Sequence, residues 1–367
     1  MINSLYVHIP FCKKKCLYCD FNSYVRLDIQ DDYIKALLTE IKRINQSKFK
    51  TIFIGGGTPT ILSISNLKKL LSELKKFNAD EFTVETNPGT LDDQKARILK
   101  EYGVNRISIG LQAWQNNLLE RLGRIHRVED FLISYEMLKK IGFSNINIDL
   151  MFGIPNQTMS NWVQTIENVL KLNPSHVSCY SLIIEEGTLY YEMYEKNQLT
   201  LIDEDTERQM YYYAVESLNK KGIKRYEISN FSKEGYECSH NITYWMDEEY
   251  IGVGAGAHSY VQNKRFSNYK NIDRYIEGIY LRNAIEESEV IETYDEMSEF
   301  MFMGLRMTKG IEKERFLKRF NKDVYDVYGD KINILKQKNL IIDDGKNIML
   351  TDKGIDISNQ VFINFLK

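Results

Sequence analysis

The sequence predicts an α/β protein whose first 222 residues form a partial (β/α)6 barrel of the TIM type. Short β-like runs alternate with helical patterns along this stretch, and such alternation is typical of a parallel sheet with helices outside it. Six strand–helix units are fewer than the eight of a closed barrel. The rhythm changes near Lys224, so we expect the chain to continue as an α+β extension.

The strands of the expected barrel are apolar, β-branched runs that stop at turn residues. In chain order they are Leu5–Ile9, Thr51–Ile54, Phe82–Thr86, Arg106–Leu111, Ile146–Met151 and Val177–Leu182. Helical periodicity follows each strand, in Asp31–Ile44, Leu67–Phe77, Leu91–Tyr102, Phe131–Ile141, Trp162–Leu172 and Glu204–Asn219. Since the chemistry of barrel folds sits at the carboxyl ends of the strands, the residues that follow the strands are the candidates for function.

The rest of the chain is expected to form two further parts. Residues 223–290 hold extended segments, Arg225–Phe231 and Tyr250–Tyr260, around a glycine-rich turn. Residues 291–367 are mostly helical in pattern and end in a hairpin, Leu340–Leu350, whose turn is Asp344-Gly345. Helices followed by a small hairpin predict a winged-helix-like domain at the C-terminus.

Composition excludes several classes of function. The net charge of −3 gives no broad basic surface, so nucleic acid is not an expected partner. No apolar run is long enough to cross a bilayer, and the first ten residues lack the pattern of a secretory signal. We therefore expect a cytoplasmic protein, in which clustered cysteines bind metal or catalyse rather than form disulfides.

Three of the five cysteines, Cys12, Cys16 and Cys19, directly follow the first predicted strand. A [4Fe–4S] cluster held by three thiolates keeps one iron open to an outside ligand. The adjacent lysines Lys13–Lys15 are expected to lower the pKa of these thiols. The spacing favours a cluster; a zinc site with His8 as fourth ligand and unligated cysteines are the alternatives.

The stretch from Tyr6 through Cys12 to Cys19 resembles the radical S-adenosylmethionine proteins, most closely the branch of oxygen-independent coproporphyrinogen III oxidase and HemW-type heme chaperones. The resemblance covers nearly the whole chain and includes the motifs Gly55-Gly-Gly-Thr-Pro-Thr60, Glu85-Thr-Asn-Pro-Gly89, Ser108-Ile-Gly-Leu-Gln112, Asn147-Ile-Asp149-Leu and Gly254-Ala-Gly-Ala-His258-Ser259. It implies a radical S-adenosylmethionine barrel with a [4Fe–4S] cluster on Cys12, Cys16 and Cys19. In this family one-electron reduction of S-adenosylmethionine gives methionine and a 5′-deoxyadenosyl radical.

The resemblance also implies which residues contact S-adenosylmethionine. They are Tyr6, Gly55, Gly56, Gly57, Thr58, Glu85, Gln112, Arg124 and Asp149. Glycine suits such a role because it lets the backbone approach a ligand closely. The alternatives are a simple tight turn for the glycines, a surface carboxylate for Glu85 and a structural ion pair between Arg124 and Asp149.

Three other residues with reactive side chains could have a structural role rather than a functional one. His126 is either a further site residue or an exposed loop histidine. Cys179 and Cys238 are expected to be small core residues rather than ligands. No residue is assigned a catalytic role from the sequence.

Two features separate the relatives in this branch. The oxidase carries a further cysteine two residues after the third, where this chain has Phe21, which counts against coproporphyrinogen decarboxylation. The run from His240 through Tyr244 and Trp245 matches the His-Asn-x-x-Tyr-Trp motif associated with heme binding in HemW-type proteins. The resemblance therefore implies heme contacts by His240, Tyr244 and Trp245, and a histidine is a common axial ligand of heme iron.

The sequence thus favours a heme chaperone that binds heme, a [4Fe–4S] cluster and S-adenosylmethionine, and transfers the heme to an acceptor apoprotein. Oxidative decarboxylation of coproporphyrinogen III to protoporphyrinogen IX is the alternative activity. An electron donor and peripheral contact with membrane proteins are further options among the partners. The acceptor, the oligomeric state and the use of S-adenosylmethionine in turnover stay open at this point.

Overall fold

One twelve-stranded sheet organises most of the protein in the computed structural model, which describes residues 2–367. Its centre is a run of six parallel strands that neighbour one another in chain order: β1 (Ser4–Ile9), β2 (Thr51–Gly56), β3 (Glu81–Thr86), β4 (Arg106–Gln112), β5 (Asn145–Phe152) and β6 (His176–Ser181). Each matches a strand that the sequence predicts. This arrangement confirms the partial six-stranded barrel.

The barrel stays open because its two edge strands pair with other partners. On one side β9 (Tyr250–Val253) runs parallel to β1, and on the other β8 (Asn230–Ser232) runs antiparallel to β6. The sheet continues from β9 through β10 (His258–Val261) and β11 (Lys264–Asn268) to β12 (Ile285–Val290). The expected extended segment Tyr250–Tyr260 is thus two antiparallel strands, β9 and β10, joined by the glycine-rich turn.

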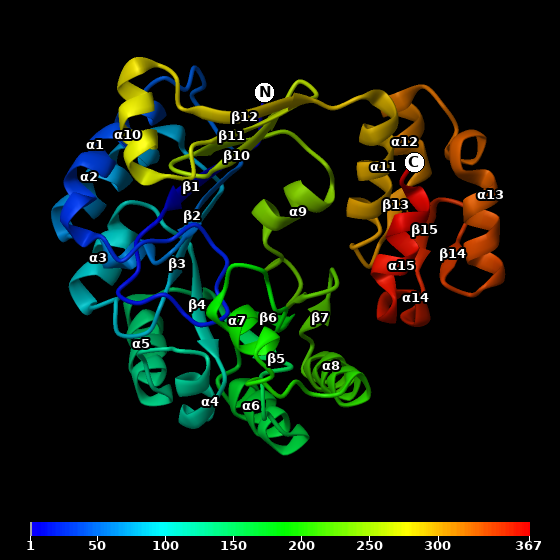
Figure 1. The fold of residues 1–367 in the computed structure, drawn as a ribbon, viewed down its shortest axis with the longest axis horizontal. Helices are drawn as coiled ribbons and strands as arrows, with labels where there is room; N and C mark the ends of the chain where they lie inside the picture. The colour runs from blue at the N-terminus through cyan, green and yellow to red at the C-terminus, as the bar shows by residue number, and fades with distance from the viewer. Residues whose placement is uncertain (1) are drawn as a thin grey trace.

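The six predicted helices cover the outer face of the barrel (Figure 1). They are α1 (Gln30–Ile41), α2 (Ile64–Leu74), α3 (Asp93–Glu101), α5 (Val128–Ile141), α6 (Met159–Lys171) and α8 (Glu204–Asn219). Two short helices of the barrel, α4 (Asn116–Arg121) and α7 (Leu189–Glu195), were not predicted from the sequence. Each is too short to show a sustained helical period, and both are stabilised by packing against each other, as Leu118 and Tyr190 share one small apolar cluster.

The segment after the barrel departs partly from expectation. The predicted extended run Arg225–Phe231 is a short hairpin of β7 (Lys224–Arg225) and β8. A helix, α9 (Ser239–Trp245), then crosses between the barrel and the C-terminal helices (Figure 1). After β11, α10 (Ile272–Leu281) packs against α1.

The C-terminal part has its own sheet and core. Its elements run α11 (Thr293–Gly304), β13 (Ile311–Glu312), α12 (Lys313–Phe320), α13 (Val324–Gln337), β14 (Ile341–Asp343) and β15 (Asn347–Leu350). This order, with the three strands in one antiparallel sheet, confirms the winged-helix-like domain. Two short helices, α14 (Asp352–Asp356) and α15 (Ser358–Phe362), follow it. Within residues 2–367, no helix has both the length and the apolar character needed to cross a membrane.

Arginine side chains of the C-terminal domain contact the C-terminal end of α9 and the residues that follow it. Arg319 donates a hydrogen bond to the Asp247 carbonyl at 2.7 Å and forms an ion pair with Glu296 at 2.7 Å. The guanidinium of Arg306 lies 4.4 Å from the centre of the Trp245 ring. The C-terminal domain therefore fixes where α9 meets the open side of the barrel.

The separate C-terminal core yields a stability prediction. Ile332 on α13 is fully buried, whereas Ile334 on the same helix is 47% exposed. We expect Ile332→Ala to lower the free energy of unfolding by about 2–5 kcal/mol, because it leaves a cavity in a packed core. The control Ile334→Ala should change it by less than about 0.5 kcal/mol. Thermal or urea unfolding measures both, and equal effects would contradict the assigned packing.

Candidate functional site

A cavity of about 480 Å³ lies at the carboxyl ends of the parallel strands. Loops after several strands contribute to its wall, which is where barrel folds hold their chemistry. The predicted site residues that line it are Cys12, Cys16, Cys19, Gly56, Gly57, Glu85, Gln112, Arg124 and Asp149. Residues from distant parts of the chain thus come together at one place.

Backbone hydrogen bonds hold the loop that carries the three cysteines at its start and in its middle. At its start, the Cys12 amide donates to the carbonyl of Tyr24 at 3.0 Å. In its middle, the Leu17 amide donates to the carbonyl of Leu122 at 3.0 Å, and the Leu17 carbonyl accepts from the amide of Tyr190 at 2.9 Å. The sulfur of Cys12 lies 3.6 Å from Thr58 Oγ1. The short helices α4 and α7, which were not predicted from the sequence, therefore position this loop.

Burial dominates the acidity of the loop thiols. It raises the pKa of Cys12, and it raises the pKa of Cys19 to about 11 although Lys15 acts in the opposite direction. The expected effect of the lysines is thus present at Cys19, through Lys15, but burial outweighs it, and no lysine is among the causes of the shift in pKa at Cys12. Iron displaces such protons on binding, so the three thiols suit a cluster that is bound as thiolates.

The zinc alternative is not supported by the surroundings of His8. Its Nδ1 lies 2.9 Å from the Tyr6 hydroxyl, and its Nε2 lies 2.8 Å from the carbonyl oxygen of Asn22. Both ring nitrogens therefore have partners within the protein, and neither faces the thiols as a fourth ligand. Among residues 2–367, no three His, Cys, Asp or Glu side chains gather where they could hold a single metal ion.

Two half-buried carboxyl groups, Glu85 and Asp149, line the cavity. Glu85, at the end of β3, accepts a hydrogen bond from the Gly56 amide at 3.1 Å. Asp149, on β5, accepts hydrogen bonds from Ser108 at 2.9 Å and Asn147 at 2.8 Å. Burial and then the charge of Asp149 raise the pKa of Glu85 to about 8. The pair is suited to a cationic ligand, whose charge offsets theirs, and Glu85 is not a surface carboxylate.

Arg124 faces the same cavity with its own partners. It donates to Asn87 Oδ1 at 2.6 Å and to the Tyr18 hydroxyl at 2.8 Å, and does not form the ion pair with Asp149 that was one alternative. Its Nε is buried without a hydrogen-bond partner in the described part of the chain. His126 beside it is buried rather than exposed, and burial together with the Arg124 charge lowers its pKa to about 4.

Gln112 reaches the cavity through an unusual backbone conformation. Its φ of +70° lies in the left-handed region that a non-glycine residue rarely adopts. The register between β4 and β5 shifts at this point, which is the mark of a bulge at the end of a strand. Bulges of this kind redirect a side chain, and here the redirected amide lines the cavity.

The glycine run after β2 brings that strand against the cysteine loop. A Cβ on Gly56, whose φ is +108°, would lie 2.5 Å from the ring of His8, and a Cβ on Gly57 would lie 2.6 Å from the Phe11 carbonyl oxygen. Only glycine allows both approaches. The run is therefore more than a tight turn. Thr58, next in sequence, lies apart from this cavity and accepts a hydrogen bond from Asn87 at 2.8 Å.

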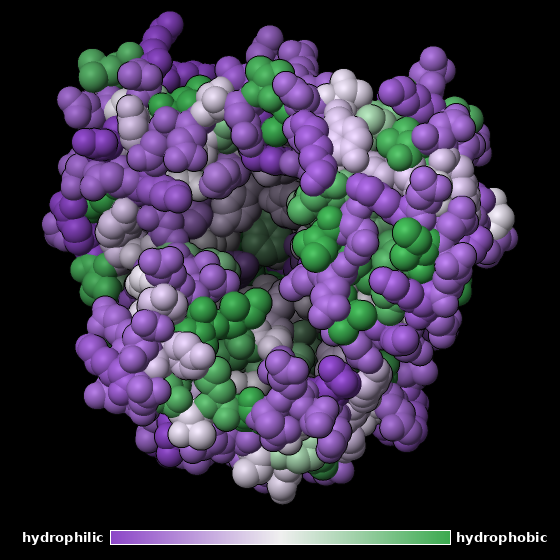
Figure 2. Space-filling model, turned by 45° about the vertical axis from the view of Figure 1, so that its right-hand side comes forward, coloured by the Kyte–Doolittle hydropathy of each residue, from purple (hydrophilic) through white to green (hydrophobic). Residues whose placement is uncertain are grey.

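A second cavity, of about 590 Å³, adjoins the first. The residues that line both cavities are Lys15, Asp20, Phe21, Ser23, Gly56 and Glu85. Tyr6 lines the second cavity rather than the first. Figure 2 shows a face of the molecule that is deeply hollowed, with hydrophobic side chains gathered at its rim and floor.

The predicted heme motif on α9 is split between three environments. His240 is buried, its Nδ1 lies 2.8 Å from Thr51 Oγ1, and its Nε2 lies 3.0 Å from the Tyr244 hydroxyl. Burial, with a smaller effect of Arg106, lowers the pKa of His240 to about 3. Tyr244 lines the second cavity, whereas Trp245 packs under Arg306. Neither His240 nor Trp245 lines the first or the second cavity.

The remaining predicted core residues behave as expected. Cys179 and Cys238 are buried free thiols with 1% and 0% exposure. Residues that sequence reasoning did not single out include Asn87 and Tyr18, which hold Arg124, and His258, which lines the second cavity. Asn87 and His258 stand in motifs that the family resemblance contained, so their positions in the sequence were a usable signal.

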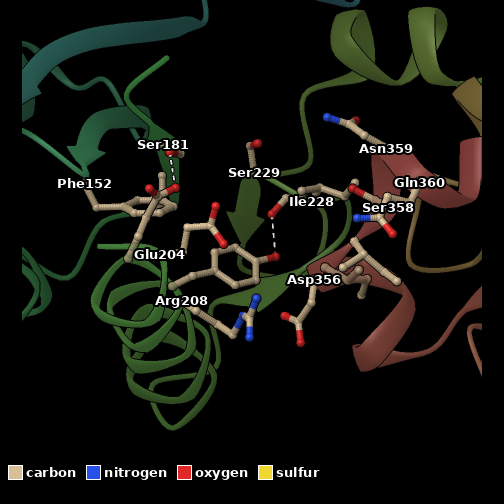
Figure 3. Close-up of a pocket in the computed structure, with 15 residues that line it drawn as sticks. Phe152, Ser181, Glu204, Arg208, Ile228, Ser229, Asp356, Ser358, Asn359 and Gln360 are labelled. Carbon is tan, nitrogen blue, oxygen red and sulfur yellow. Dashed lines mark hydrogen bonds between the residues drawn. The ribbon is translucent and has the colours of Figure 1, made fainter. Parts of the chain in front are cut away.

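A third cavity separates the barrel edge from the C-terminal domain (Figure 3). It measures about 530 Å³ and is lined by Glu204 and Arg208 of α8 on one side and by residues 355–360 on the other. Ser181 and Glu207 also line it, and the Ser181 hydroxyl donates to a carboxylate oxygen of Glu207 at 2.5 Å. No residue predicted to hold a cofactor lines this cavity.

The chain is similar to known proteins along its whole length. The radical SAM superfamily model matches residues 6–169, and the HemN C-terminal domain model matches residues 293–357. Heme chaperone HemW of Bacillus subtilis is 40% identical over 100% of this chain and 99% of its own length. The HemW of Lactococcus lactis is 40% identical over 99% of this chain and 97% of its own length. That of Escherichia coli is 34% identical over 86% of this chain and 85% of its own length.

Among solved structures, the radical SAM enzyme coproporphyrinogen III oxidase (HemN) from Escherichia coli superposes with a TM-score of 0.86. The match covers 99% of this chain and 90% of that chain at 22% identity. At this identity the likeness concerns the fold. It agrees with the order of strands and helices described above.

The close approach at Gly57 gives a test of the cysteine loop. We expect Gly57→Ala to lower Tm and the iron bound per chain after anaerobic reconstitution, because its Cβ would collide with backbone atoms of Phe11 next to Cys12. Gly329→Ala on α13 is the control, since its Cβ would make ordinary contacts with Tyr325. This control should raise stability slightly, by about 0.5–1 kcal/mol. Full iron loading of Gly57→Ala would contradict the geometry.

The raised pKa of Glu85 predicts a pH-dependent stability. Between pH 4.5, its ordinary pKa, and its folded pKa of about 8, the folded protein holds this proton more tightly than the unfolded chain. Stability from this group therefore falls as pH rises through that window. We therefore expect the difference in Tm, Glu85→Gln minus wild type, to increase from pH 5 to pH 8 and to stay constant above pH 8.

Thermal unfolding of the cluster-free protein across this pH range measures the effect. Glu277→Gln, on the exposed face of α10, controls for the loss of one acidic group. A difference between Glu85→Gln and wild type that does not vary with pH would show that Glu85 is ionised in the folded protein at neutral pH.

Proposed function

Since the chain belongs to the heme chaperone HemW family, we propose that it binds heme and transfers it to an acceptor protein. The observation that carries the proposal is similarity to HemW proteins along the whole chain, at 40% identity to the Bacillus subtilis protein. The architecture supports it, because the cysteine cavity adjoins a second, aromatic-lined cavity.

Cys12, Cys16 and Cys19 are the residues that would hold a [4Fe–4S] cluster. Their three thiols fit the group because they line one cavity together and have no disulfide partners. When bound, such a cluster supplies single electrons to S-adenosylmethionine. A cluster with three protein ligands leaves one iron for an outside donor.

S-Adenosylmethionine fits the remainder of the first cavity by charge and shape. A cation bound beside Glu85 and Asp149 would lower their raised pKa values, and the two groups, once ionised, would offset its positive charge. Gly56 and Gly57 offer backbone without side chains, and Arg124 and Gln112 bring hydrogen-bond donors to the opposite wall. Gly55 lies against Glu85, since a Cβ on Gly55 would come within 2.9 Å of the Glu85 carboxylate, and Thr58 contacts the Cys12 sulfur. Tyr6 lines the second cavity.

Phe21 bears on the choice between carrier and oxidase. It lines both cavities and is 59% exposed, at the position where the oxidase branch has its further cysteine. An exposed apolar ring at the shared mouth suits an apolar cargo and offers no thiol for chemistry. The chain therefore departs from the oxidase at the place where the two cavities meet.

The transfer is proposed to take place in the cytoplasm, with an acceptor that takes up heme, including proteins at the periphery of the membrane. All five cysteines are free, which suits a reducing compartment. If S-adenosylmethionine is reduced, a separate electron donor must supply the electron to the cluster. Nucleic acid has no part in it.

Two assays on one preparation test the function. The reconstituted protein is loaded with hemin and mixed with apomyoglobin as a surrogate acceptor, and the myoglobin spectrum is followed with time. Separately, it is incubated without oxygen with coproporphyrinogen III, S-adenosylmethionine and a reductant. We expect heme transfer faster than from hemin bound to serum albumin, and no protoporphyrinogen IX. Formation of protoporphyrinogen IX at catalytic rates would instead establish the oxidase.

A further inference from the structure

A histidine can ligate heme iron only through a ring nitrogen that is not already used in a hydrogen bond within the protein. The chain has five histidines. His8 and His240 use both ring nitrogens in hydrogen bonds, as described above. His176 does the same, with its Nδ1 2.6 Å from Asn147 Oδ1 and its Nε2 2.9 Å from the Tyr226 hydroxyl. His126 is buried against the carbonyl of Leu111. Iron ligation by any of these four needs an internal hydrogen bond or a buried position to be given up.

Among residues 2–367, His258 is the one histidine that is exposed and whose ring has no hydrogen-bond partner. It lines the second cavity, as His8 also does. Its backbone, in contrast, is fixed. A Cβ on Gly252 would lie 2.1 Å from the His258 carbonyl oxygen, and the Gly252 amide donates to Ser259 Oγ at 2.9 Å. The strand pair β9–β10 thus holds an unpartnered imidazole at a set place.

The walls of this cavity suit a flat aromatic ligand. Tyr6, Tyr244 and Tyr250 line it, and the rings of Tyr244 and Tyr250 meet edge to face with centroids 4.7 Å apart. Its volume of about 590 Å³ lies within the range of small-molecule sites, which is about 300–1,000 Å³. Tyrosine rings provide apolar faces for a macrocycle and hydroxyl groups at the edge.

His240 has a structural part in this wall. Its Nε2 lies 3.0 Å from the Tyr244 hydroxyl, and its ring stacks on Phe53 at 5.0 Å between centroids. It therefore fixes the position of Tyr244 from behind. The histidine of the α9 motif builds the cavity rather than entering it.

Two lysines supply positive charge at the cavity. Lys15 and Lys270 are exposed and line it, whereas the carboxyl groups that line it are Asp20 and Glu85. The Lys15 ammonium uses one hydrogen bond, to the Phe21 carbonyl at 3.1 Å, and keeps two N–H groups for other acceptors. The backbone of Lys270 is tied by the Tyr24 hydroxyl at 2.8 Å. Both are placed to pair with carboxylates at the edge of a ligand.

We propose that His258 ligates the heme iron in the cavity walled by Tyr6, Tyr244 and Tyr250, with Lys15 and Lys270 binding the two heme propionates. The inference rests on the proposed heme-carrier function and names the ligand within it. It replaces the earlier expectation that His240 contacts the heme. Neutral imidazole is a common axial ligand of heme iron, and His258 is free to provide it.

Hemin titration of the full chain with reconstituted cluster tests the ligand. We expect wild type and His240→Ala to give the same Soret wavelength, although His240→Ala lowers Tm because it leaves Tyr244 and Thr51 without their partner. His258→Ala should shift the Soret band and raise the Kd for hemin at least tenfold. Added imidazole should restore the wild-type wavelength in His258→Ala, a rescue that a merely structural role would not give.

Binding of iron-free protoporphyrin IX distinguishes ligation of the iron by His258 from the fit of the macrocycle in the cavity. Because it has no metal to ligate, wild type and His258→Ala should bind it with equal Kd. A wild-type Soret band in His258→Ala, or loss of that band in His240→Ala alone, would overturn the assignment while leaving the carrier function standing. Absence of hemin binding by wild type would instead overturn the proposed function itself.

The lysines are tested in the same titration. Lys15→Ala and Lys270→Ala should each raise the Kd for hemin several-fold without moving the Soret band, because they act on the propionates and not on iron. Lys264→Ala, exposed on β11 but outside the cavity, is the matched control and should behave as wild type. Equal effects of all three substitutions would show a general charge effect and overturn the propionate assignment.

Discussion

The rest of the site depends on the close approach of the β2 end to the cysteine loop at Gly56 and Gly57. No side chain fits between Gly57 and the Phe11 backbone, or between Gly56 and the His8 ring. Because the two segments touch, Cys12 stands beside Thr58, and the Gly56 amide turns to Glu85. One steric constraint thus sets the position of the cluster thiols and of the acid that faces them.

The same contact divides the open barrel into two connected cavities. Gly56 and Glu85 belong to both, and Phe21 lies at their shared mouth. A cation bound near Glu85 therefore changes the electrostatic field in the second cavity as well as in the first. If two ligands bind on the two sides of such a wall, each changes the affinity of the other by the same factor. If the cluster and heme bind as proposed, their two cavities are parts of one site, and the iron–sulfur cofactor would have a role in a carrier protein.

Most of the fold could be predicted from the sequence, because strands, helices and the Cys12–Cys19 spacing are local patterns. All six barrel strands and their six helices lie where periodicity placed them, whereas the short helices α4 and α7 and, after the barrel, α9 and α10 were not predicted. The site was predicted less completely. The backbone turn at Gln112, the burial of His240 and the place of Tyr6 in the second cavity arise from packing between residues far apart in the chain. Thiol acidity at Cys19 was misjudged for the same reason, since neighbours in sequence showed the lysines but not the burial.

The central claim, that cofactor and heme share one site, is tested most directly by linkage. The Kd for hemin is measured on cluster-loaded protein with and without saturating S-adenosylmethionine, and again on Glu85→Gln. The account predicts a several-fold change in Kd on adding S-adenosylmethionine to wild type, and a smaller change in Glu85→Gln. The same Kd for hemin in the presence and absence of S-adenosylmethionine would contradict it.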